Sequence, residues 1–448
     1  MISDITKNCI KAKELIQSQP DNSKIRVVSH YDADGITSAA IICKMLYRMG
    51  YSFHCSLMRN PFDRGLKIVS NEENNLIIFT DMGSGQIEMI EKIDAKSIII
   101  DHHQIKKEKT DEKIIQINAN QYGINGNYEA CGATLSYFFA KTIDPKNKDL
   151  VGLAIAGATG DKQYIGGFRG FNKEIIDDGI KNNFLKQKTC IKLTGETIYE
   201  SLFYSIDPYY SELSGNNKKI MELIDKIGIS KETTIKELDE KQIRQLNSYL
   251  MLILIRNGCE KNILDTVIRN RYKSEIIFNC ESEMFADLLD SCGKGGNRGL
   301  GFATAMGDEE SFIEAIELEK EYKTKILKEL ISLEKDGFLE KKNFRYFYSK
   351  NSSLGGVIGG IATNFMLDIK KPLISIVRNK DEIHVSCRGN QTLVKRGLDL
   401  GDAMKKAAQK LDGHGGGHAI AAGATIKLEK EEEFLEFTDK IIDGQIKK

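Results

Sequence analysis

The stretch KIRVVSHYDADGITSAAIICKMLYRMG, residues 24–50, decides the fold. It begins with an apolar run typical of a buried strand, and from Gly35 onward it has the apolar face of a helix that stops at a glycine. Between the two, His30, Asp32 and Asp34 occupy alternate positions. Because alternate side chains of an extended segment lie on one side, an imidazole and two carboxylates are predicted to converge where the strand ends.

Aspartates at this place also have a purely structural explanation, because aspartate is common in turns and as the N-cap residue of a helix. The pattern recurs further along the chain, however. Three more apolar runs end in acids or histidines: Asp81 after LIIFT, the triplet Asp101-His102-His103 after SIII, and Asp161 after VGLAIAGATG. The chain has only 7 histidines in 448 residues. Chance then predicts only about 0.1 adjacent pairs, so the recurrence favours a functional site over unrelated turns.

Strand-like and helix-like runs alternate through the first third of the chain. Further strands are expected at residues 51–58, 76–81, 97–101 and 114–120, and further helices at 86–93, 131–143 and 148–158. This alternation predicts an α/β fold in which a parallel sheet is flanked by helices. Sites in open sheets of this kind lie beyond the carboxyl ends of the strands, where the acids and histidines occur.

The rest of the chain is organised differently. Residues 165–340 have a mainly helical pattern, with a glycine-rich break at 293–302 and a charged stretch at 308–337 that forms one long helix or two. From residue 342 strands return and alternate with helices. We therefore expect an N-terminal α/β domain over 1–165 that contains the acids and histidines, a helical insertion and linker over 166–340, and a smaller α/β domain over 341–448.

Composition sets few functional limits. Lys and Arg together number 64, as do Asp and Glu, so the net charge is zero and favours neither a polyanion nor a membrane as partner. No apolar run approaches the roughly 18 residues needed to span a bilayer. The 9 cysteines include no CxxC pair, which predicts free thiols in a reducing cytoplasm and argues against structural zinc.

The residue types at the strand ends indicate a divalent metal centre. Carboxylates together with imidazoles suit Mn²⁺ or Mg²⁺. Five or six such ligands exceed what one ion needs while it still binds water. Two ions that share carboxylates about 4 Å apart fit the number better, and such pairs promote in-line attack on phosphorus.

At this point the sequence resembles a known superfamily. SHYDADG, TDMG, DHH and ATGD, in this order, are similar to the four motifs of the DHH phosphoesterases. The tail GHGGGHAIAAG, preceded by SCRG, resembles the associated C-terminal domain, DHHA1. Within the superfamily the chain most resembles RecJ-type single-strand exonucleases, particularly the archaeal RecJ-like proteins. The four ordered motifs and the tail together make this a specific signal.

The resemblance implies a role for each motif residue. The metal ligands would be His30, Asp32, Asp34, Asp81, His102 and Asp161. Asp81 would be the bridging acid, and His30 stands where bacterial RecJ proteins have an aspartate. The catalytic residues would be Asp81, His103, which faces the scissile phosphate in the family, and Asp101, which orients its neighbours.

A glycine-rich segment in the middle of the chain adds two candidate phosphate contacts. LLDSCGKGG, residues 288–296, resembles a RecJ segment written Asn-Ala-x-Gly-Arg, with Asp290 in place of the asparagine and Lys294 in place of the arginine. Lysine can contact a phosphate, but without the two-pronged geometry of arginine. Arg298 in the same glycine loop can compensate. The alternative is an ordinary surface loop.

The C-terminal glycines predict a second phosphate-binding element. Gly415, Gly416 and Gly417 permit close backbone approach, so that amides can point at a phosphate beside His418 and Arg388. A tight turn between a helix and a strand would explain the glycines alone, and the likeness to DHHA1 favours binding. The expected substrate-binding residues are Lys294, Arg298, Arg388, Gly416, Gly417 and His418.

We therefore expect a metal-dependent phosphodiesterase that uses two Mn²⁺ or Mg²⁺ ions. The resemblance specifies a RecJ-like exonuclease that releases mononucleotides from single-stranded DNA or RNA in replication or repair. One alternative is cleavage of short oligonucleotides or cyclic dinucleotides, although small-substrate members usually join their domains by a short linker. Another is a scaffold that associates with the GINS replication complex, but the retained ligands favour an enzyme. No membrane partner is expected.

Overall fold

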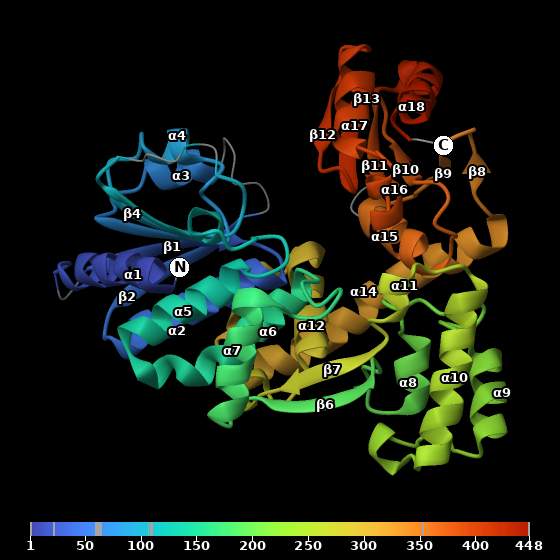
Figure 1. Ribbon diagram of the computed structural model, residues 1–448, viewed down its shortest axis with the longest axis horizontal. Coiled ribbons are helices and arrows are strands. Elements are labelled where there is room, and N and C mark those ends of the chain that lie inside the picture. The colour runs from blue at the N-terminus through green and yellow to red at the C-terminus, as the bar shows by residue number, and fades with distance from the viewer. Residues whose placement is uncertain are drawn as a thin grey trace. The chain divides into compact units, whose positions relative to one another are not determined.

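In the computed structural model, residues 2–20, 23–58, 65–105, 107, 111–351 and 354–446 are described. Contacts group the chain, whose elements are labelled in Figure 1, into two compact units. The first comprises residues 1–190 and 269–319, and the second comprises 191–268 and 320–448. Each unit is thus built from two separate segments. The three-part division expected from the sequence stays a prediction.

The first unit contains a five-stranded parallel sheet. The strands lie in the order β2-β1-β3-β4-β5. Their bounds are β1 Lys24–His30, β2 Ser52–Met58, β3 Leu76–Thr80, β4 Lys96–Asp101 and β5 Ile114–Asn118. All of β3 is buried, since helices cover both faces of a parallel sheet and its central strands must be apolar throughout. The expected α/β fold is confirmed.

Helices cover both faces of this sheet. One face carries α1 Ile2–Gln17, α2 Ala33–Arg48 and α5 Gly132–Ile143, and the other carries α3 Leu66–Ser70 and α4 Ile87–Ile90. Alternate strand residues divide between the two cores, with Ile78 on the side of α2 and Ile77 on the side of α4. The helix expected at 86–93 is therefore shorter than predicted.

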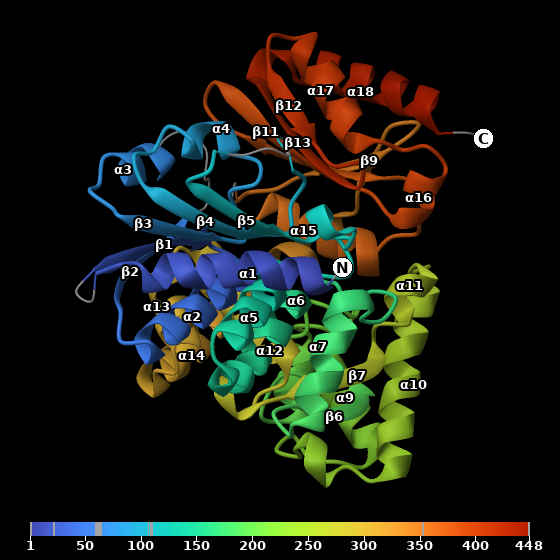
Figure 2. The ribbon, with the colours of Figure 1, turned by 60° about the vertical axis from the view of Figure 1, so that its left-hand side comes forward.

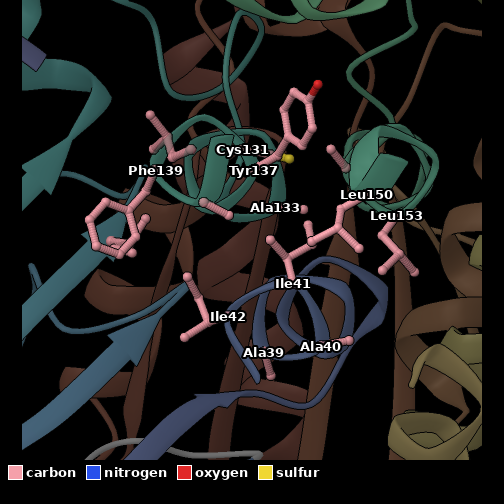
Figure 3. Close-up of a cluster of buried hydrophobic side chains, with 14 of the residues drawn as sticks. Ala39, Ala40, Ile41, Ile42, Cys131, Ala133, Tyr137, Phe139, Leu150 and Leu153 are labelled. Carbon is pink, nitrogen blue, oxygen red and sulfur yellow. The ribbon is translucent and has the colours of Figure 1, made fainter. Parts of the chain in front are cut away.

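A further helix, α6 Val151–Gly160, packs against α2 and α5. Figure 3 shows the apolar side chains that meet here, among them Ile41, Ala133 and Leu153. A side chain at Gly157 would begin 2.5 Å from the Ala133 Cβ atom, so only glycine allows this close approach. A 3-10 turn at Pro145–Leu150 precedes α6, so the helix expected from residue 148 begins later.

The remaining elements of the first unit come from two parts of the chain. They are α7 Gly170–Lys181, the paired strands β6 Lys186–Ile191 and β7 Ile268–Lys273, and the helices α12 Ser282–Gly295 and α13 Arg298–Ala305. The glycine-rich break expected at 293–302 is shorter than predicted, because only Gly296 and Asn297 separate α12 from α13. Gly293 packs within α12, where an added Cβ atom would lie 1.9 Å from the Tyr31 carbonyl oxygen.

The second unit combines helices with a six-stranded mixed sheet. Its helices include α8 Ile198–Phe203, α9 Asn217–Ile227, α10 Glu240–Arg256, α11 Lys261–Leu264, α15 Gly355–Phe365, α16 Gln391–Lys395, α17 Leu400–Gln409 and α18 Glu431–Gln445. Its sheet has the order β12-β13-β11-β10-β9-β8. The strands are β8 Leu339–Glu340, β9 Arg345–Tyr348, β10 Leu373–Arg378, β11 Glu382–Arg388, β12 His414–Gly417 and β13 Ala421–Lys427.

Helices of the second unit also cover its sheet. In Figure 2, α15 lies along one face, while α17 lies on the other with α18 beside it. The charged stretch at 308–337 forms one helix, α14 Glu309–Asp336, which contains the boundary between the two units. Among the helices that the structure describes, none is both long and apolar enough to cross a membrane.

Candidate metal centre

The carboxyl edge of the five-stranded sheet brings the predicted ligands together. His30 ends β1, Asp81 follows β3, and Asp101 ends β4. Asp81 has the left-handed φ of +54°, a conformation that aspartate tolerates better than most residues. Its backbone N–H donates to the Ile100 carbonyl at 2.9 Å, which fixes the turn beside the end of β4.

Two groups of ligand atoms share the Asp81 carboxylate. On one side, His30 Nδ1 lies 2.8 Å from Asp32 Oδ2 and 3.7 Å from Asp81 Oδ2. On the other side, His102 Nε2 lies 3.1 Å from Asp81 Oδ1 and 3.4 Å from Asp161 Oδ2. Asp34 Oδ2 completes the second group, 3.7 Å from His102 Nε2. All six predicted ligands therefore lie at one place. They form two groups that could hold a metal ion, His30 with Asp32 and Asp81, and Asp34 with His102 and Asp161, while Asp81 also groups with His102 and His103.

Asp34 is held by the start of α5. Its two carboxylate oxygens accept hydrogen bonds from the backbone N–H groups of Gly132 and Ala133, at 2.7 and 2.8 Å. The N-terminus of a helix favours negative charge, because its first N–H groups have no partner within the helix. Both oxygens of this carboxylate, which is only 1% exposed, thus have a hydrogen-bond donor.

His102 is oriented by a backbone carbonyl. Its Nδ1 donates to the Gly126 oxygen at 2.6 Å, so Nε2 is the ring atom that faces the acids. The buried Gln163 side chain donates to the same Gly126 oxygen at 3.0 Å and to the Ala130 oxygen at 2.9 Å. Asn172 donates in turn to Gln163 at 2.6 Å. Gln163 is thus a positioning residue for His102 that the sequence analysis missed.

Asp101 supports the triplet and lies outside the ligand groups. Its Oδ1 atom accepts from His103 Nδ1 at 2.7 Å and from the His102 backbone N–H at 2.8 Å, and its Oδ2 accepts from the Ser84 N–H at 2.9 Å. Burial alone would raise the pKa of Asp101, but the hydrogen bond and positive charge of His103 hold it well below its usual range. Asp101 is therefore a permanent anion that aligns both histidines.

His103 differs from His102 in its exposure. Its side chain is 55% exposed, whereas that of His102 is 10% exposed. Asn118 donates to the His103 carbonyl at 3.0 Å, and Asn120 donates to the carbonyls of His102 and His103 at 3.0 and 3.1 Å. The backbone of the triplet is therefore fixed from the side of β5, while the His103 ring faces solvent.

The acids of the site repel one another. Burial first, and then the negative charges of Asp34 and Asp32, hold the pKa of Asp81 well above its ordinary range. Burial and the charge of Asp34 raise the pKa of Asp161 to about 7. Burial lowers the pKa of His102, but the charges of Asp161 and Asp34 outweigh it and raise that pKa to about 9. A divalent cation would relieve this concentration of negative charge.

The donor atoms fit Mn²⁺ or Mg²⁺. They are carboxylate oxygens and imidazole nitrogens, which suit these ions, whereas structural zinc favours thiolates. Cys131 lies beside Asp34, but burial and the charges of Asp34 and Asp161 raise the pKa of its thiol well above the usual range. A neutral thiol is a poor metal ligand. The structure therefore provides a divalent-cation site built from histidines and aspartates.

The cations predicted in the middle of the chain border the loop after β1. The Asp290 carboxylate accepts from the Ala33 N–H at 2.9 Å and pairs with Lys294. The Arg298 guanidinium donates to the Leu57 carbonyl at 3.4 Å and lies 5.6 Å from the centre of the Tyr31 ring. Asp290 therefore helps to position the Asp32–Asp34 turn. Phosphate binding by Lys294 and Arg298 stays a prediction.

The C-terminal residues predicted to bind substrate meet at one end of the second sheet. Arg388 pairs with Ala421, and Gly417 pairs with Ala422. His418 and Ala421 exchange two backbone hydrogen bonds, of 2.9 and 3.2 Å, at the hairpin. An added Cβ atom at Gly417 would lie 2.6 Å from the Ala422 Cα atom, so packing alone already requires this glycine. The binding role of the cluster stays a prediction.

Comparisons with known proteins place the chain in a family. Residues 24–158 match the N-terminal domain of the DHH family, and residues 343–444 match the DHHA1 domain. An uncharacterized protein of Methanocaldococcus jannaschii is 32% identical over 431 residues, covering 95% of this chain and 94% of the relative. The chain belongs to the DHH/DHHA1 phosphoesterase family.

Solved structures show the same fold at low sequence identity. CDC45 from Entamoeba histolytica has a TM-score of 0.68 at 14% identity, with 98% of this chain and 99% of that chain covered. RecJ from Thermus thermophilus, solved with Mn²⁺, has a TM-score of 0.60 at 14% identity. The match covers 98% of this chain and 54% of that chain. This chain therefore spans about half of that RecJ protein.

Gln163 provides a first test of how the site is built. Replacing Gln163 with leucine should weaken Mn²⁺ binding by about 10–100-fold. The Gly126 carbonyl, which accepts from His102, would lose the hydrogen bond from Gln163 that holds it in place. The measurement is a calorimetric Mn²⁺ titration. Gln19→Leu is the matched control, since Gln19 is also a buried amide and lies in the segment after α1. Unchanged Mn²⁺ affinity in a folded Gln163→Leu protein would contradict the positioning role.

Proposed function

We propose that the protein is a two-metal phosphodiesterase of the RecJ-like kind, which hydrolyses single-stranded nucleic acid to mononucleotides. The observation that carries this proposal is the set of overlapping ligand groups around Asp81 and His102. A pair of divalent cations supplies a nucleophile at neutral pH and polarises phosphate oxygens. His30, Asp32, Asp34, His102 and Asp161 would hold these ions together with Asp81.

The side chains around the ligands would assist the reaction in distinct ways. Because Asp101 accepts the Nδ1–H of His103, the opposite edge of the exposed ring can donate to a phosphate oxygen. The neighbouring Asp101 carboxylate also raises the pKa of His103 to about 9 against the opposing effect of burial, so the ring is cationic at neutral pH. A fixed cation here would offset the negative charge that develops on the phosphate oxygens.

Two other functions are compatible with the family. Short oligonucleotides or cyclic dinucleotides are alternative substrates of the same site. The second alternative is a scaffold role, which is considered because of the structural likeness to CDC45. The complete set of six ligand side chains favours catalysis, since a scaffold has no need to keep buried acids whose charges repel one another. Binding to GINS or other replication proteins is compatible with either role.

A digestion experiment tests the proposal directly. End-labelled 30-mers of single-stranded DNA and RNA, and a labelled 5-mer, are incubated with the protein in Mn²⁺ and then in Mg²⁺. We expect stepwise release of mononucleotides from a 30-mer, and complete loss of activity when EDTA removes the cations. Cleavage of the 5-mer alone would favour the small-substrate alternative. If no substrate is cleaved with either ion, the proposed function is wrong.

A further inference from the structure

A pocket in the first unit borders the DHH triplet. It has a volume of about 650 Å³ and is lined by Asn8, Gln104, Ile105, Asn120, Gln121 and Tyr122. We call it the amide pocket. The lining residues come from α1, from the segment after His103, and from the 3-10 helix Ala119–Tyr122 that follows β5. Three separate segments therefore form its wall.

The chemistry of the amide pocket differs from that of the metal centre. None of its lining side chains carries a charge at neutral pH, since four are amides, one is a phenol and one is aliphatic. A pocket of this kind is poorly suited to a phosphate or a carboxylate. An amide offers one acceptor and two donors in one plane, which matches the edge of an uncharged heterocycle. The Tyr122 ring can stack on its face.

Hydrogen bonds hold part of the wall in place. The Asn8 amide donates to the Gln116 carbonyl at 3.1 Å and to the Tyr122 hydroxyl at 2.7 Å, so the tyrosine ring is held in position. Gln104 and Gln121 differ from Asn8, because both are exposed, and Gln121 has only a long hydrogen bond of 3.4 Å, to the Gln116 side chain. These two side chains are therefore the ones available to recognise a ligand.

The position of the pocket links it to the proposed chemistry. Asn120, which lines it, donates to the carbonyls of His102 and His103 at 3.0 and 3.1 Å. A nucleobase is joined to its phosphate through a single sugar. A phosphate held at His103 would therefore bring a neighbouring base to the amide pocket.

We propose that the amide pocket binds a nucleobase of the single-stranded substrate. The proposal rests on the proposed nuclease function and deepens it, because it explains how the site distinguishes a nucleotide from a phosphodiester without a base. Gln104 and Gln121 supply the hydrogen bonds to the base, and Tyr122 supplies the flat surface. Two hydrogen bonds to the base should give roughly tenfold discrimination against a substrate that lacks it.

The test compares substrates that differ only in the base. One set of 30-mer DNAs carries a thymine at each of the first two positions from either end, and the matched set carries abasic residues there. The wild-type protein should cleave the abasic set about tenfold more slowly. The double variant Gln104→Ala, Gln121→Ala should lose most of this preference. Gln245→Ala, an exposed amide on α10, should keep it.

Two results would overturn the inference. One is that the wild-type protein cleaves both sets at the same rate. The other is that the double variant keeps the full preference for the thymine set. Failure of the proposed function itself gives a different result, because the wild-type protein would then cleave neither set. In that case binding of thymidine monophosphate against ribose 5-phosphate decides the matter. Tighter nucleotide binding that the double variant loses supports the pocket, and equal binding refutes it.

Discussion

Replacing Asp81 with asparagine should abolish hydrolysis and at the same time stabilise the metal-free protein. Activity should fall by about 10³-fold or more, because Asp81 is the only acid that belongs to two of the three candidate ligand groups formed by the described residues. Asparagine keeps an acceptor oxygen but loses the charge that binds a cation. The first measurement is therefore hydrolysis of single-stranded DNA in Mn²⁺.

The gain in stability follows from the pKa of Asp81. Burial and the charges of Asp34 and Asp32 hold this pKa well above its ordinary range. A carboxyl group with a higher pKa in the folded than in the unfolded state binds protons more tightly when folded. The folded protein therefore loses stability as pH rises from the unfolded pKa through the raised folded pKa. Asparagine is neutral, so at neutral pH the Asp81→Asn protein does not lose this folding free energy.

Thermal unfolding in EDTA and in Mn²⁺ measures both effects. In EDTA the Asp81→Asn protein should unfold at a higher temperature than the wild type, by about 1 °C for each kcal/mol gained. In saturating Mn²⁺ the order should reverse, since only the wild type gains binding free energy. Asp94→Asn, an exposed acid before β4, should change neither midpoint. An Asp81→Asn protein that keeps the full Mn²⁺ shift would show that Asp81 is no ligand.

The ligand side chains were predictable because they follow a local rule. Three of the sequence motifs place acids or histidines directly at the carboxyl ends of parallel strands, and such ends meet at one edge of a sheet. The adjacency of His102 and His103 added a second local signal. Asp161 follows a helix instead of a strand. It was still predictable, because an apolar run in the sequence ends at this aspartate.

The residues that orient the ligands were not predictable in this way. Gln163 acts through the Gly126 carbonyl, and Asn120 acts through the backbone of the triplet. Neither lies at a strand end or in a repeated pattern, because a hydrogen bond to a backbone oxygen can come from any nearby amide. Their roles depend on which segments the fold brings together.

Glycines misled the sequence analysis for a related reason. The run around Gly293 is typical of a loop, since glycine destabilises a helix interior. In the fold, Gly293 lies inside α12. Glycine is required there because the Tyr31 carbonyl leaves no room for a side chain. Close packing and backbone flexibility both require glycine, and sequence alone does not separate the two causes.

The second large effect is expected at His103. Replacing it with alanine should lower kcat by about 10²–10³-fold, the usual cost of removing one donor to developing negative charge. KM and Mn²⁺ affinity should change little, because the His103 ring is largely exposed and its Nδ1 atom is committed to Asp101. Stopped-flow or quench assays of kcat, together with a Mn²⁺ titration, separate these quantities.

The same experiment distinguishes two possible roles of the ring. His103 also belongs to a group with Asp81 and His102 that could hold a metal ion. If it is a ligand, His103→Ala should weaken Mn²⁺ binding as strongly as His102→Ala does. If it contacts the phosphate, His102→Ala should lose Mn²⁺ affinity while His103→Ala keeps it. Asp101→Asn should then resemble His103→Ala more than His102→Ala, because the carboxylate mainly keeps the His103 ring charged and aligned.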